Sequence, residues 1–88
     1  MSIINDVFST KDTEICRLTT ALDFASITQI DEFNLYDTPL KTRYVVTTQI
    51  DGQVLSSEFA TFGEASMMYR FRVKGIIKRD NILYDLIP

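Results

Sequence analysis

The sequence predicts a small α+β domain: a helical N-terminal third, an antiparallel sheet over residues 33–59, a packed amphipathic helix over residues 62–77, and a short C-terminal strand. Three observations predict it. Apolar residues near the N-terminus recur at helical spacing, an Asp-Gly pair separates two extended runs, and a helix-capping pattern follows the second run. The 88 residues fit one domain spanning residues 1–88.

The N-terminal segment shows helical spacing of its apolar residues. Four apolar side chains within residues 1–8 share one face of a helix: Ile3, Ile4, Val7 and Phe8. Ser2 precedes them and belongs to the residue types that cap helices. We therefore expect a short amphipathic helix at the N-terminus.

Residues 13–25 fit two different periods. One set of apolar positions has helical spacing: Ile15, Leu18, Leu22 and Ala25. Ser9 and Asp12 resemble a capping pair before it. A second set fits a period of two: Cys16, Leu18, Leu22 and Phe24. The threonines in this segment favour strands. The sequence favours a helix here and leaves a strand as the alternative.

A hairpin is the clearest local feature of the sequence. Residues 33–36 read as a short strand, and Pro39 closes a turn over residues 37–39. Residues 43–50 are β-branched and aromatic, and residues 53–59 form a second extended run. Between them stands Asp51-Gly52, which is the strongest short-range signal for a hairpin.

A helix is expected directly after the hairpin. Thr61 and Glu64 form a capping box, in which the Thr61 hydroxyl accepts from the Glu64 N–H and the Glu64 carboxylate reaches the Thr61 N–H. One side of the following helix collects Ala65, Met68, Tyr69, Arg72 and Ile76. Gly75 ends the helix or lies in its last turn. Residues 79–81 are a turn and residues 82–87 a final strand.

The composition argues against catalysis and against a metal or cofactor site. The chain has no His, the usual acid-base group and metal ligand, and its one Cys has no partner for a disulfide or a zinc pair. No glycine loop or nucleophile motif is present. No targeting signal or membrane-spanning run is recognised either. We expect a non-enzymatic protein of the cytoplasm, either of its own cell or of an infected host.

Charge is divided unevenly along the chain. Residues 1–40 hold seven acids and two bases, for a net −5, whereas residues 41–88 hold seven bases and five acids, for a net +2. We call the first candidate surface the acidic patch: Asp23, Asp31, Glu32 and Asp37. We call the second the basic stripe: Arg70, Arg72, Lys74, Lys78 and Arg79. Each has a simpler interpretation as a solvated face.

The leading functional hypothesis is a small protein-interaction module, a regulator or inhibitor of the kind that phages and mobile elements encode. It would bind a protein partner through one of the two charged surfaces. One alternative is a nucleic-acid-binding protein that uses the basic helix at residues 69–79, although the net charge of −3 argues against it. The other is a structural subunit that forms a homodimer through a hairpin edge or an apolar helix face.

Overall fold

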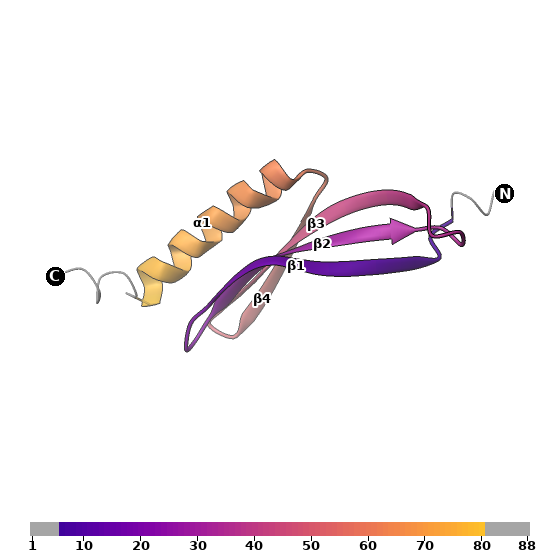
Figure 1. The fold of residues 1–88 in the computed structure, drawn as a ribbon. Helices are drawn as coiled ribbons and strands as arrows, with labels where there is room; N and C mark the ends of the chain where they lie inside the picture. Colours follow the sequence, from indigo (N-terminus) through magenta and orange to yellow (C-terminus); the bar gives the residue numbers. More distant parts are fainter. Residues whose placement is uncertain (1–5, 81–88) are drawn as a thin grey trace.

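The computed structural model describes residues 6–80 as a four-stranded antiparallel sheet followed by one helix (Figure 1). Consecutive strands are neighbours, in the order β1-β2-β3-β4. The elements are β1 (Ser9–Thr19), β2 (Phe24–Phe33), β3 (Pro39–Ile50), β4 (Gln53–Phe59) and α1 (Phe62–Asp80).

The predicted fold class is wrong in its N-terminal third, because residues 9–25 form β1 and the start of β2 instead of a helix. Of the predicted N-terminal helix, residues 1–5 lie outside the described residues, and residues 6–8 are not helical. The Phe8 N–H donates to the Phe33 carbonyl at 2.8 Å, which extends the β1–β2 pairing. The predicted strand over residues 82–87 also lies outside the described residues.

A β-bulge in β1 explains the mixed periodicity of this segment. The pairing between β1 and β2 shifts register between Glu14 and Cys16, so Ile15 is an extra residue in the strand. A bulge inverts the alternation of side chains between the two faces. After the bulge the even-numbered residues Cys16 and Leu18 face α1, whereas before the bulge the odd-numbered residues lie on that side. The apolar pattern of β1 therefore has no single period of two.

The two following turns have local causes in the sequence. Asn34 is buried, and its side-chain carbonyl accepts from the N–H groups of Tyr36 at 2.9 Å and Thr38 at 3.0 Å. β2 therefore ends at Phe33, and the strand predicted for residues 33–36 is wrong. The predicted Asp51-Gly52 hairpin is confirmed: both residues have positive φ, 56° and 77°, as a two-residue β-turn of this kind requires.

The core lies between α1 and one face of β2 and β3. Ile27, Val46 and Ala65 are its centre, and Ile76 is equally buried further along α1. Partly buried side chains surround this centre: Cys16, Tyr44, Phe59, Met68 and Tyr69. Burial and a hydrogen bond with the Cys16 thiol raise the pKa of Tyr69. This contact ties the edge strand β1 to the helix.

The helix covers only part of the sheet, and the molecule is elongated. Its principal extents are 60 × 24 × 15 Å, and its radius of gyration is 16.5 Å. A compact domain of this length has a radius of gyration of about 12 Å. In Figure 1 the ends of β1, β2 and β3 near the N-terminus extend beyond α1 as a ribbon without a second layer. The interior that stabilises the fold is thus confined to the α1 half.

The start of α1 confirms half of the predicted capping box. The Glu64 N–H donates to the Thr61 hydroxyl at 3.2 Å, while the Glu64 carboxylate accepts from that hydroxyl at 2.9 Å instead of from the Thr61 N–H. We expect Thr61→Ala to lower the free energy of unfolding by about 1 kcal/mol. Urea denaturation measures this loss. Thr61→Ser keeps the hydroxyl and should stay close to the parent, so an equal loss in both variants would contradict the capping role.

Candidate functional site

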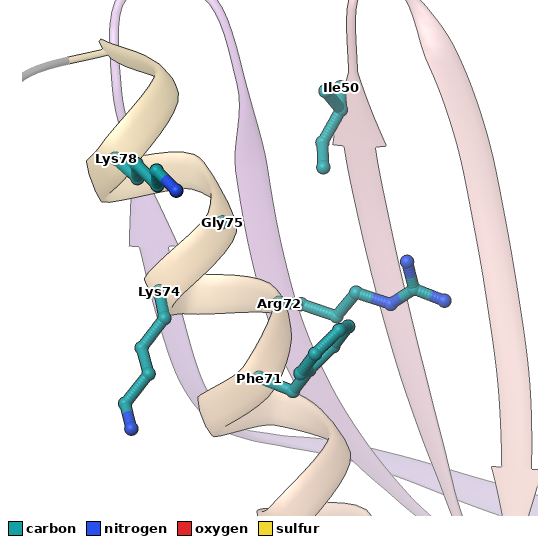
Figure 2. Close-up of a pocket in the computed structure, with 6 residues that line it drawn as sticks. All are labelled: Ile50, Phe71, Arg72, Lys74, Gly75 and Lys78. Carbon is teal, nitrogen blue, oxygen red and sulfur yellow. The ribbon is translucent and has the colours of Figure 1, made fainter.

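A groove runs along the flank of α1, and the sheet lines it at Ile50, the last residue of β3, and at Phe59, the last residue of β4. Its larger segment, of about 380 Å³, is lined by Ile50, Phe71, Arg72, Lys74, Gly75 and Lys78 (Figure 2). A second segment, of about 300 Å³, adjoins it at Phe71 and is lined by Phe59, Glu64, Met67, Met68 and Phe71. We call the two segments together the β4 groove. Its size falls in the range of ordinary ligand-binding clefts.

The β4 groove exists because α1 lies mainly over β2 and β3. The helix-facing side chains of β4 are therefore only partly covered. Leu55 faces the same side as the buried Thr48, its partner in β3, yet 49% of its surface is exposed. Phe71 and Met67 on the helix flank are 68% and 74% exposed. Exposed apolar side chains that line one groove, as Met67 and Phe71 do, mark interaction sites in soluble proteins.

Three cations of the basic stripe lie along the exposed side of α1. Arg70, Lys74 and Lys78 are four residues apart on one unbroken helix, so they span about 12 Å. No carboxylate among residues 6–79 lies within ion-pair distance of any of the three. Lys74 and Lys78 also line the groove; in Figure 2 the Lys78 amine lies on the side of the helix toward the strands, whereas the Lys74 amine points away from Ile50. The groove therefore has a cationic rim.

The other two cations of the basic stripe are placed differently. Arg72 points from α1 toward the β3–β4 side of the groove in Figure 2, and its guanidinium carbon lies 5.9 Å from the centre of the Phe71 ring. Arg79 pairs with the buried Asp23 at 2.7 Å and with Asp51. Arg72 thus belongs to the groove, whereas Arg79 holds the end of α1 to the sheet. The stripe predicted from sequence is not one surface.

The structure does not gather the acidic patch into one surface. Asp23 is fully buried at the start of β2, about 26 Å along the strand from Asp31. Asp31 and Glu32 are sequence neighbours that point to opposite faces of the sheet. Asp37 lies in the β2–β3 turn with a φ of 60°. As partner-binding residues the four remain a prediction.

The two central acids of the patch are engaged within the sheet. The Asp31 carboxylate accepts from the Thr42 hydroxyl at 2.7 Å and from the Gln29 amide at 3.0 Å. Glu32 pairs with Arg43 at 2.8 Å. The contacts with Thr42 and Arg43 link β2 to β3. Both carboxylates therefore have fewer free oxygen lone pairs with which to bind a partner.

Sequence analysis missed the apolar half of the groove, because it did not identify Met67 and Phe71 as exposed residues. The positions of the apolar residues along the helix nevertheless indicate that Phe71 is exposed. Ala65 and Ile76 define the buried side of the helix, and at 100° per residue Phe71 lies 120–140° from both of them, a rotation of about a third of a turn or more. Only one side of a helix on a single sheet is buried, so Phe71 had to face away from the core.

In the part of the chain that the structure describes, no three His, Cys, Asp or Glu side chains come together as a metal site requires. Within the same residues, α1 is too polar to cross a lipid bilayer. Comparison with protein families, curated proteins and solved structures finds nothing that matches this chain. The groove is therefore interpreted from its own geometry and charge.

Proposed function

We propose that the chain is a protein-interaction module that binds an extended, acidic and partly apolar segment of a partner protein in the β4 groove. The observation that carries this proposal is the combination of an apolar groove, at Ile50 and Phe71, with a rim of cations that have no carboxylate partner among residues 6–79. Apolar side chains of the segment would fill the groove while its carboxylates pair with Lys74 and Lys78. The module acts in the cytoplasm as a regulator or inhibitor.

Charge and ring placement favour a protein partner over nucleic acid. The whole chain carries a net charge of −3, and a stripe of three cations neutralises few phosphates. Binding of single strands also depends on aromatic rings that stack on bases between the cations. Tyr69 is partly buried against Cys16, and Phe71 faces the groove below the stripe. The β4 groove instead offers the mixture of apolar and charged contacts that a peptide supplies.

A labelled synthetic peptide that alternates Leu and Glu is a suitable first probe, measured by fluorescence anisotropy. We expect it to bind, whereas the matching Leu-Lys peptide does not. The double variant Lys74→Glu with Lys78→Glu should weaken binding at least tenfold, because like charges then face each other across the groove rim. The double variant Lys11→Glu with Lys41→Glu makes the same change in net charge on the distant ribbon and should bind as the parent does.

Two results would overturn the proposal. One is equal binding of the acidic and basic peptides, and the other is an equal loss of affinity in the two double variants. A labelled single-stranded oligonucleotide provides a third arm of the same experiment. If it binds more tightly than the acidic peptide and its affinity falls steeply with salt, the nucleic-acid function replaces this one.

A further inference from the structure

The two edges of the sheet differ in how they are protected against pairing with another strand. β1 carries four charged side chains and the bulge at Ile15: Lys11, Asp12, Glu14 and Arg17. Charges and bulges are the usual means by which proteins prevent edge-to-edge association. β4 has one charged residue, Glu58, and pairs with β3 without a register shift. Val54, near the other end of β4, is 58% exposed. β4 is therefore the edge open to association.

The hairpin register identifies which main-chain groups of β4 are free to pair. A two-residue turn is flanked by a hydrogen-bonded pair, here Ile50 and Gln53, and such pairs recur at every second position. Every second residue from Gln53 onward thus directs its N–H and C=O toward β3. Val54, Ser56 and Glu58 direct theirs to the outer edge of the sheet.

We propose that two copies of the chain associate through β4, antiparallel and around a two-fold axis at Ser56. In this register Ser56 faces its own counterpart, and Val54 faces Glu58 of the second copy. Each of these pairs exchanges both of its N–H···O bonds, because all three residues direct their groups outward. The two Glu58 carboxylates lie about 13 Å apart along the strands, so they do not oppose each other.

The same two-fold axis brings together the apolar groups that one copy leaves exposed. Phe59 lies beside Met67 and Met68 in the β4 groove, and Ile50 lies beside Gly75 and Lys78. The middle of β4 is therefore level with Phe71. Around the axis, Phe71 of each copy faces the other across the joined β4 strands. Glu64 of one copy stands at the same end as Lys78 of the other, so their charges are complementary.

The dimer converts the open β4 groove into a channel with two walls. Strands are spaced about 4.8 Å apart, so two helices that each lie over β2 and β3 have axes about 19 Å apart. Helices with side chains are about 10–12 Å wide, which leaves about 8 Å between them. An extended chain fits this width and a helix does not. That a peptide occupies the channel rests on the proposed function, whereas the pairing of the β4 edges does not.

Sedimentation velocity of the full chain tests the pairing. We expect twice the 10.1 kDa mass of one chain, and dissociation on dilution. Ser56→Lys places two ammonium groups opposite each other on the axis and should raise the dimer dissociation constant at least tenfold. Ser56→Pro removes the outward N–H without removing a bond to β3 and should have the same effect. Thr10→Lys adds the same charge to the β1 edge and should leave the dimer intact.

Each result of these measurements either supports or overturns the β4 dimer. A single-chain mass at every concentration overturns the dimer, as does a dimer that Ser56→Lys and Ser56→Pro leave unchanged. Circular dichroism with thermal unfolding verifies that both variants keep the fold. The peptide measurement separates the two proposals, because Lys74→Glu alone weakens peptide binding and leaves Lys78 opposite Glu64 of the second copy, so this variant should remain a dimer. Loss of the dimer alone leaves the single-walled groove and its peptide in place.

Discussion

Arg79→Ala is expected to lower the free energy of unfolding by about 3 kcal/mol, because it leaves a buried carboxylate without its cation. The side chain of Asp23 is fully buried, and Arg79 lies 2.7 Å from it. Domains of this length have a total stability of about 4–13 kcal/mol, so the loss is a large part of the whole. Urea denaturation followed by circular dichroism measures it.

The size of this effect follows from the position of Asp23 at the meeting point of three elements. Its N–H donates to the Thr20 hydroxyl at 2.9 Å within the β1–β2 turn, and its carboxylate accepts from the Asp51 N–H at 3.2 Å in the β3–β4 turn. Arg79 adds the end of α1. Loss of the cation therefore loosens both turns and the last turn of the helix together.

Arg70→Ala is the matched control, because it removes the same side chain from the same helix. Arg70 is exposed and has no ion pair within residues 6–79, so its loss should change stability by no more than about 0.5 kcal/mol. In a background that carries Asp23→Asn, Arg79→Ala should cost much less than in the parent, since the buried charge is gone. Equal costs in both backgrounds would refute the ion pair as the cause.

The contacts of Asp23 also show which features of the fold cannot be predicted from local sequence. Asp23 and Arg79 were predicted to belong to two opposite binding surfaces, whereas they bind each other across 56 positions of the chain. No sequence pattern near Asp23 or near Arg79 predicts this ion pair. The Asp51-Gly52 turn and the Thr61 cap were predictable because their hydrogen bonds lie within four residues.

The prediction of a helical N-terminal third was wrong for a related reason. The apolar residues of β1 and β2 carry both periods because the bulge at Ile15 interrupts the alternation, and helical spacing then appears by coincidence. Long-range pairing with β2 and β3 decides the conformation of such a segment. The groove could be predicted in part, since the spacing of Lys74 and Lys78 placed them together on the helix. The exposure of Phe71 required knowing that a single sheet covers one side of α1.

Ile27→Ala should cost about 2–5 kcal/mol, whereas Ile30→Ala on the same strand should cost about 1 kcal/mol. Ile27 is 1% exposed and packs against Val46 and Ala65 beneath α1. Ile30 lies three residues further along β2, so its side chain is on the face of the sheet that α1 does not cover, and it is only partly buried. Truncation there opens no cavity, because water reaches the side chain already.

This pair of variants tests whether the stability of the molecule is concentrated in its α1 half. The two substitutions remove the same atoms from the same central strand, so intrinsic strand preference and the unfolded state contribute alike to both. The difference between the two losses of stability measures how much packing against α1 contributes. Urea denaturation of both variants provides the comparison, with the slope against denaturant as a check on two-state unfolding. Equal losses would mean that the uncovered ribbon is packed as well as the core, by a second copy or by another partner on its open face.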